Sequence, residues 1–183
     1  MGVGVLASGT GTNLEAILEA GVPVNVVVVD RACRATEIAD RAGVPVELVE
    51  RGPIGPDFDR LRFTERVVDA LQSHGVDLVA MAGFMTILEK PVFDTFGARI
   101  LNTHPSLLPV FPGAHAVEDA LEAGVKVTGC TVHVATIEVD AGPILAQEAV
   151  PVLDGDTVES LHERIKAVER RLYPDTIKRL IAA

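Results

Sequence analysis

The sequence predicts an α/β fold, with an open, parallel, Rossmann-like sheet that later strands extend within a single domain. Short Val-rich apolar runs alternate with segments of helical periodicity in the first part of the chain. Near-continuous apolar strands separated by helices are typical of a parallel sheet whose two faces are both covered. The length, 183 residues, is sufficient for one domain with a substantial core.

The first part of the chain is expected to contain four strands and three helices. The strands are Gly2–Ala7, Val24–Val29, Val44–Val49 and Asp77–Ala82, and the helices are Thr12–Ala20, Ala35–Ala42 and Phe58–Ser73. β-Branched residues favour the pleated surface of a sheet. The apolar residues of the helical segments recur instead on one helical face.

The later part of the chain has a different arrangement of expected strands and helices. Strands are expected at Ala98–Thr103, Val125–Thr136 and Gly142–Val152, with a short helix at Ala116–Ala123. A last helix begins after Thr157, a residue type that caps helices. Pro174 is expected to restart or kink this helix, because proline lacks the N–H that a helix interior needs.

Composition and charge limit the kinds of partner. The formal net charge is -10, which argues against broad binding to nucleic acid. Cys33 and Cys130 are the only cysteines, so neither a disulfide framework nor a zinc site is expected. The N-terminus does not look like a signal peptide, and no apolar run approaches the ~18 residues that span a bilayer. We expect a soluble, cytoplasmic protein.

A glycine-rich stretch, "ASGTGTNL" at residues 7–14, lies between the first expected strand and the first expected helix. Parallel α/β sheets bind phosphate at this position. A plain strand-to-helix turn is the simplest alternative. A dinucleotide fingerprint is another, since Asp30 follows Gly11 at about the usual 20-residue spacing. Leu14 occupies the position of the third glycine, so a monophosphate cradle fits better than a pyrophosphate site.

The stretch "LNTHPSLLP" at residues 101–109 carries the side chains best suited to chemistry. Asn102 and His104 are two residues apart, so in an extended segment they point to the same side. Pro105 biases His104 toward extended geometry. An Asn amide can donate to a developing oxyanion, and a His can exchange a proton at neutral pH. A structural histidine at a polar strand end is the alternative.

A carboxylate beside His104 would orient its ring and favour the imidazolium. Asp140 lies in a loop bounded by Gly and Pro and could supply that carboxylate. Glu138 could do so instead, and Asp140 could simply start a turn with Gly142. The spacing in the sequence leaves the choice between these two acidic residues open.

Three segments together resemble the phosphoribosylglycinamide formyltransferase family, folate-dependent enzymes of purine synthesis. They are "SGTGTNL" at 8–14, "LNTHPSLLPVFPGAHA" at 101–116 and "GCTVHVATIEVDAGPILAQ" at 129–147. The resemblance extends from Val3 to about Tyr173. It implies one formyltransferase domain at 1–183, with a phosphate-binding half at 1–100 and a catalytic and folate-binding half at 101–183.

The resemblance also implies roles for individual residues. The catalytic residues would be Asn102, His104 and Asp140, and the substrate-binding residues Gly11, Thr12, Asn13, Lys166 and Glu169. The co-substrate 10-formyltetrahydrofolate would be held by Asn102, by the backbone of Met85, Thr86, Ile87 and Leu88, and by Thr136, Ile137, Glu138, Val139 and Asp140, with Arg60 near its tail. Thr86 stands where many relatives carry Arg, and Lys166 where some carry Gln.

The expected reaction is formyl transfer from 10-formyltetrahydrofolate to the amine of glycinamide ribonucleotide, by a monomer or a homodimer. A formyltetrahydrofolate deformylase would use water as the acceptor instead. A chain that resembles a deformylase normally has an additional N-terminal domain. A transfer-RNA formyltransferase would want a basic domain after the catalytic one, which the net charge and the stop at Ala183 oppose. From other classes, an NAD-dependent reductase and a non-catalytic nucleotide-binding module remain alternatives.

Overall fold

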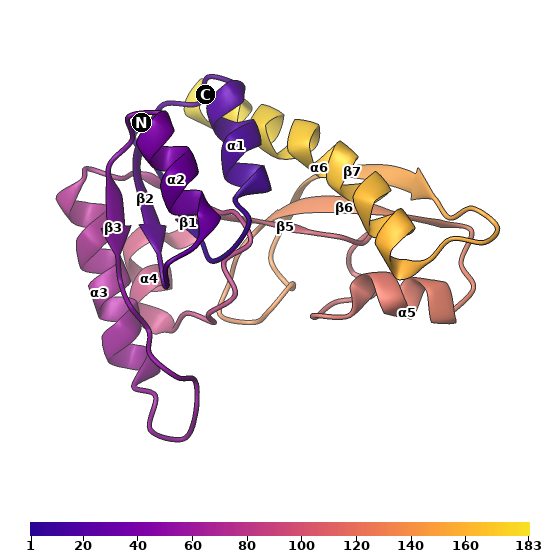
Figure 1. The fold of residues 1–183 in the computed structure, drawn as a ribbon, viewed down its shortest axis with the longest axis horizontal. Coiled ribbons are helices and arrows are strands. Elements are labelled where there is room, and N and C mark those ends of the chain that lie inside the picture. Colours follow the sequence, from indigo (N-terminus) through magenta and orange to yellow (C-terminus); the bar gives the residue numbers. More distant parts are fainter. The chain divides into compact units, whose positions relative to one another are not determined.

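The computed structural model describes all 183 residues and has the expected α/β architecture. It contains six α-helices, one short 3₁₀ helix and seven strands, and the strands form a mostly parallel sheet. The chain divides into two compact units, Met1–Leu101 and Asn102–Ala183 (Figure 1). None of the helices combines the length and the apolar character that a bilayer-spanning segment requires.

The first unit is built from alternating strands and helices. Its elements are β1 (Val3–Ala7), α1 (Thr12–Glu19), β2 (Val24–Val29), α2 (Arg34–Arg41), β3 (Val46–Leu48), α3 (Arg60–Ser73), β4 (Leu78–Met81), α4 (Lys90–Phe96) and the 3₁₀ helix Gly97–Arg99. The strands lie in the order β3-β2-β1-β4 and pair in parallel. Helix α1 packs beside α2, and α3 beside α4.

Burial explains why the strand sequences of this unit are continuously apolar. Every residue of β1 is buried, as are the last four residues of β2. Such strands are covered on both faces, so they show no polar alternation. Because the strands are parallel, Ala7, Val29 and Met81 end at one edge of the sheet. The loops that follow them therefore gather at that edge.

The second unit contains the remaining strands and helices. Its elements are β5 (Ile100–His104, which begins at the boundary), α5 (Ala116–Glu122), β6 (Val127–Val134), β7 (Ile144–Pro151) and α6 (Val158–Ile181). The strands lie in the order β5-β6-β7, and β6 and β7 are antiparallel. A core of buried side chains joins α5, α6 and the two antiparallel strands, namely Val117, Cys130, Val150, Leu161 and Ile165.

Three details differ from the sequence-based expectations. Helix α4 was not expected, and Pro91 at its start shows why the segment tolerates a helix there. Helix α6 is one continuous helix from Val158 to Ile181, so Pro174 does not restart it. Strand β6 starts and ends two residues inside the expected range Val125–Thr136, at Val127 and Val134, and it is buried on both faces from Thr128 to Val134. Thr157 caps α6 as expected, accepting from the backbone N–H of Ser160.

Candidate active site

The imidazole of His104 lies at the end of β5 between two oxygen acceptors. Its Nε2 is 2.8 Å from the carbonyl oxygen of Phe111, and its Nδ1 is 3.3 Å from Oδ2 of Asp140. A carbonyl oxygen only accepts, so Nε2 must carry a proton. The carboxylate of Asp140 also only accepts. The contacts of both ring nitrogens are therefore satisfied together only when Nδ1 carries a proton as well. The geometry therefore favours the imidazolium form of His104.

Asp140 is the carboxylate next to His104, which answers the question that the sequence left open. Its Oδ2 also accepts from the backbone N–H of Gly113 at 2.8 Å. Asp140 adopts a left-handed backbone conformation with φ 55°, as does Phe111 with φ 54°. Non-glycine residues in this region cost energy and often mark functional sites. Glu138 is exposed, and its backbone carbonyl accepts from the hydroxyl of Thr136.

His133 is a third polar group at this place, and the sequence analysis assigned it no role. Its Nδ1 lies 3.1 Å from the carbonyl oxygen of Val134, so Nδ1 is the protonated nitrogen. Burial lowers the pKa of His133, which keeps the ring neutral. The free lone pair of Nε2 accepts from Nδ2 of Asn102 at 3.4 Å and lies 3.6 Å from Oδ1 of Asp140. His133 thus turns the amide nitrogen of Asn102 toward the polar cluster.

One signal in the sequence could have identified His133. It lies on the same strand as Thr131, two residues away, and so shares that residue's face of the pleat. A histidine that is fully buried in a strand beside a polar strand end needs partners for both of its nitrogens. The sequence alone could not show that one of these partners is Asn102, 31 residues earlier.

The glycine loop lies at the carboxyl edge of the first unit's strands. Gly11 is the N-cap of α1, with φ 72° and no side-chain cap, so the helix begins with free backbone N–H groups. The backbone N–H of Ser8 donates to the carbonyl of Gly83, and the hydroxyl of Ser8 accepts from the N–H of Met85 at 3.0 Å. Thr12 and Asn13 follow in the first helical turn and are partly exposed.

The segment Met85–Leu88 alternates between exposed and buried side chains. Met85 is 70% exposed and Ile87 55% exposed, whereas Thr86 and Leu88 are buried. The hydroxyl of Thr86 donates to Oδ2 of Asp30 at 2.7 Å, which anchors the segment to the end of β2. Met85 is therefore not a core residue.

The second unit has a similar exposed apolar segment at Thr136–Asp140. Ile137 is 65% exposed and Val139 56% exposed. The carbonyl of Glu138 accepts from Thr136, which shapes the turn that leads to Asp140. Gly142 ends this turn, and a Cβ at that position would lie 1.8 Å from the carbonyl oxygen of Val134. Glycine is required there because the two backbones approach closely.

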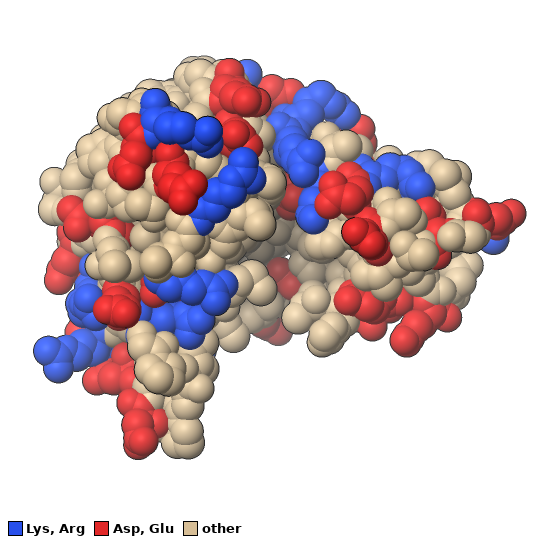
Figure 2. All heavy atoms as spheres, viewed as in Figure 1, with Lys and Arg blue, Asp and Glu red and all other residues tan.

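Helix α6 carries one acidic residue and one basic residue that are expected near the substrate, Glu169 and Lys166. Glu169 accepts from the hydroxyl of Thr103 at 2.9 Å, so it packs against the face of β5 that carries Thr103, opposite to that of Asn102 and His104. Lys166 is paired with Glu163 at 2.8 Å. Acidic and basic side chains alternate over α6 in the space-filling view, rather than forming a single basic patch (Figure 2). The amine of Lys166 would have to leave Glu163 to contact a ligand.

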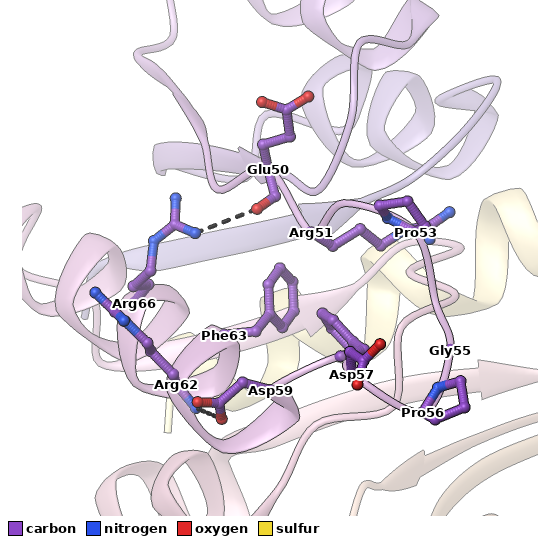
Figure 3. A pocket seen from close by; sticks show the side chains of 11 residues that line it. Glu50, Arg51, Pro53, Gly55, Pro56, Asp57, Asp59, Arg62, Phe63 and Arg66 are labelled. Atoms are coloured by element: carbon purple, nitrogen blue, oxygen red, sulfur yellow. Dashed lines mark hydrogen bonds between the residues drawn. The ribbon is translucent and has the colours of Figure 1, made fainter.

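A surface cavity of about 460 Å³ lies in the first unit beside the start of α3. Figure 3 shows Arg62 and Arg66 on one side of it and Arg51 with Pro53 on the other. Arg51 is held by Asp30, with Nε 3.2 Å from Oδ2, and Arg66 donates to the carbonyl of Glu50. Arg60 does not line this cavity.

Arg60 stacks on an aromatic ring instead. Its guanidinium lies 5.7 Å from the centre of the Phe58 ring, and the Phe58 ring contacts that of Phe63. A guanidinium over an aromatic face is held by cation–π attraction but keeps its donors free. Arg60 is thus able to receive a carboxylate from solvent.

The structure brings the expected residues together in two groups. In the second unit, His104 and Asp140 are in contact, and Asn102 joins them through His133. In the first unit, the glycine loop and Met85 are joined through Ser8. No side-chain contact of Thr12, Asn13, Ile87 or Leu88 indicates a ligand by itself.

Comparison with known proteins identifies the family to which this chain is similar. The formyl transferase family model matches residues 1–177. A protein of Mycobacterium tuberculosis named phosphoribosylglycinamide formyltransferase is 53% identical over 173 residues, which cover 92% of this chain and 79% of the relative.

Solved structures agree. Glycinamide ribonucleotide transformylase 1 from Symbiobacterium toebii is 49% identical, with a TM-score of 0.89 over 97% of this chain and 85% of the other. Phosphoribosylglycinamide formyltransferase from Streptococcus pneumoniae TIGR4 is 37% identical, with a TM-score of 0.90 over 98% of both chains. The family model and these relatives extend over nearly the whole chain, and together they show that the protein belongs to the formyl transferase family of enzymes.

Proposed function

We propose that the protein transfers the formyl group of 10-formyltetrahydrofolate to the amine of glycinamide ribonucleotide, a step of purine biosynthesis. The observation that carries the proposal is the placement of His104 between the Phe111 carbonyl and Asp140, which favours its imidazolium. Relatives named for this reaction, at 53% and 49% identity, support it.

Asn102 and His104 are proposed to stabilise the oxyanion that forms when the amine attacks the formyl carbon. The amide of Asn102 has two N–H groups on Nδ2, of which one is engaged by His133. The second is free to donate to the oxyanion. Donors aimed at a developing charge typically contribute about 10²–10³ in rate each.

His104 is proposed to supply a positive charge and a hydrogen-bond donor to the oxyanion. In the resting enzyme its Nε2–H is held by the carbonyl of Phe111. On reaction this N–H would turn from Phe111 to the formyl oxygen, while Nδ1–H stays on Asp140. The proton that the amine loses then passes, directly or through water, to the departing folate nitrogen. Asp140 holds the ring in orientation and compensates its charge throughout.

The binding proposal assigns different residues to the phosphate and to the folate. The backbone N–H groups at Gly11, Thr12 and Asn13 are suited to a phosphate, because a helix N-terminus attracts anions. The segment of Met85 and Ile87, with its exposed apolar side chains, is proposed as a folate contact, and the segment of Ile137 and Val139 is a separate proposed folate contact. Arg60 is proposed to contact the folate tail.

Two further assignments complete the binding proposal. Glu169 is proposed to contact the ribose of the substrate. Lys166 is also proposed to contact the substrate, which requires its amine to leave Glu163. The chain is proposed to act as a single formyltransferase domain in the cytoplasm, as a monomer or a homodimer, on small molecules only. The folate is a co-substrate, and the chemistry needs no metal.

The experiment that tests the proposal compares transfer with hydrolysis. Tetrahydrofolate release is measured from 10-formyltetrahydrofolate alone, with glycinamide ribonucleotide, and with the riboside that lacks the phosphate. Binding energy at a remote phosphate positions an attacking amine, so release should be fast only with the ribonucleotide. Equally fast release without any acceptor would identify a hydrolase and refute the proposal.

A further inference from the structure

A buried hydroxyl and a side-chain amide hold the loop that follows His104. Thr131 Oγ1 donates to the carbonyl of Ser106 at 2.7 Å and accepts from the backbone N–H of Leu108 at 3.1 Å. Gln147 Nε2 donates to Thr131 Oγ1 and to the carbonyl of Leu108, both at 2.9 Å. We call these four hydrogen bonds the Thr131–Gln147 clamp.

Every hydrogen-bonding position of the clamp is used. A hydroxyl has one donor and two acceptor sites, and Thr131 uses all three. The Nε2 of Gln147 has two N–H groups, and both are engaged. Thr131 is fully buried, so water cannot replace a lost bond there. Removing the hydroxyl therefore takes away the donor to the Ser106 carbonyl and the acceptor of the Leu108 N–H, which are two of the hydrogen bonds that hold the loop.

The loop that the clamp holds connects the clamp to the ring of His104. The loop it holds continues to Val110, whose carbonyl accepts from the hydroxyl of Ser106. The next residue is Phe111, whose carbonyl receives the Nε2–H of His104. The loop thus starts at the backbone of His104 and returns to its ring. A shift of the loop would move the acceptor that holds the ring.

We propose that Thr131 and Gln147 are positioning residues for His104. They fix the loop Ser106–Val110 so that the Phe111 carbonyl holds the imidazolium in line with Asp140 until the formyl group takes over Nε2–H. Neither residue touches the reacting atoms. The inference rests on the proposed role of His104 in formyl transfer and extends it to two residues of β6 and β7.

The chain offers a matched control on the same strand. Thr128 is buried like Thr131, but its hydroxyl has no hydrogen-bond partner. Thr128→Val and Thr131→Val make the same chemical change at two buried sites of β6. Only the second removes the clamp. Thr131→Ser keeps the hydroxyl and serves as the rescue, and Gln147→Met removes the amide donors from a more exposed position.

The experiment measures kcat and KM for both substrates, together with the ring nitrogen NMR shifts of His104 at one fixed pH in the ligand-free enzyme. Small misplacements of a catalytic group cost up to about 10²-fold. We expect kcat to fall about 10- to 100-fold for Thr131→Val and about 3- to 10-fold for Gln147→Met, with each KM within about twofold. Thr131→Ser and Thr128→Val should keep kcat within about threefold, and only the clamp variants should move the His104 ring signals.

Two results would overturn the inference. One is an equal effect of Thr131→Val and Thr128→Val on kcat. The other is unchanged His104 ring signals in folded Gln147→Met, which decides the question if Thr131→Val does not fold. A failure of the proposed function is seen separately, since His104→Ala would then keep its activity whatever the clamp variants do.

Discussion

Replacing Gly11 with alanine should destabilise the first unit for two separate reasons. Gly11 has φ 72°, a left-handed conformation that costs a residue with a Cβ about 1–2 kcal/mol. A Cβ there would also lie 2.7 Å from Cδ1 of Ile38 and 3.0 Å from Cα of Ala35 on α2. Overpacking of this kind costs about 1–3 kcal/mol. The expected loss in the free energy of unfolding is therefore about 2–5 kcal/mol.

Two other glycines separate these contributions. Gly21 is also left-handed, with φ 75°, but a Cβ there meets nothing within 4 Å. Gly9 is not left-handed and is equally open. Urea unfolding followed by circular dichroism should give a loss within about 0.5 kcal/mol for Gly9→Ala and about 1–2 kcal/mol for Gly21→Ala. If Gly11→Ala loses no more than Gly21→Ala, the packing of Gly11 against α2 is not as described.

Three further predictions concern the acidic and imidazole groups of the second unit. Asp140→Asn should lower the kcat of formyl transfer about 10²-fold or more, because a neutral amide cannot balance the imidazolium of His104, and a variant that keeps half of the wild-type kcat would contradict this. His133 should remain neutral, with its proton on Nδ1, as the pH falls through 6.5, because burial lowers its pKa; ring nitrogen NMR measures this, and a His133 signal that protonates at 6.5 or above would refute it. The Arg164 guanidinium holds the pKa of Asp156 well below its usual range, so this pair stabilises the fold at neutral pH and its contribution is lost as the pH falls below 3.8. Asp156→Asn should therefore be less stable than wild type at pH 7 in urea unfolding, and the difference should shrink below pH 3.8 rather than stay constant.

The strands and most helices could be predicted because their signals are local. The boundaries of β2 and the N-cap of α6 are as expected, since Val-rich runs and a capping threonine carry their information within a few residues. Helix α4 was missed because it is short and begins with a proline, which was not used as a helix-start signal. Both faces of β6 are buried, and the sequence cannot show what covers the second face.

The side-chain partners of the candidate site could be predicted only in part. The common direction of Asn102 and His104 follows from their spacing on a strand. The choice of Asp140 over Glu138 depends on a contact between residues 36 positions apart in the sequence, which no local pattern indicates. The bond between Thr86 and Asp30 joins residues 56 positions apart, and the clamp of Thr131 on Ser106 spans 25 positions. Such pairs depend on the three-dimensional fold.

Gly11 shows how the structure changes an experiment suggested by the sequence. From the sequence alone, valine at Gly11 is a natural test of the phosphate cradle, because its side chain would crowd the phosphate and raise KM for glycinamide ribonucleotide. The structure places the Cβ of such a residue against α2, so loss of folding would obscure any effect on binding. Gly9→Val tests the phosphate cradle better, because Gly9 is open on all sides. It should raise KM for the ribonucleotide and leave the affinity for a folate analogue unchanged.

The central claim is that the formyl group passes to an amine of a nucleotide. The most direct measurement follows an isotope-labelled formyl carbon of 10-formyltetrahydrofolate by NMR in the presence of glycinamide ribonucleotide. The label should appear as a formamide on the nucleotide at the same rate as tetrahydrofolate is released, and His104→Ala should slow both rates by about 10²–10⁴-fold. Label that accumulates as free formate, with none on the nucleotide, would contradict the claim.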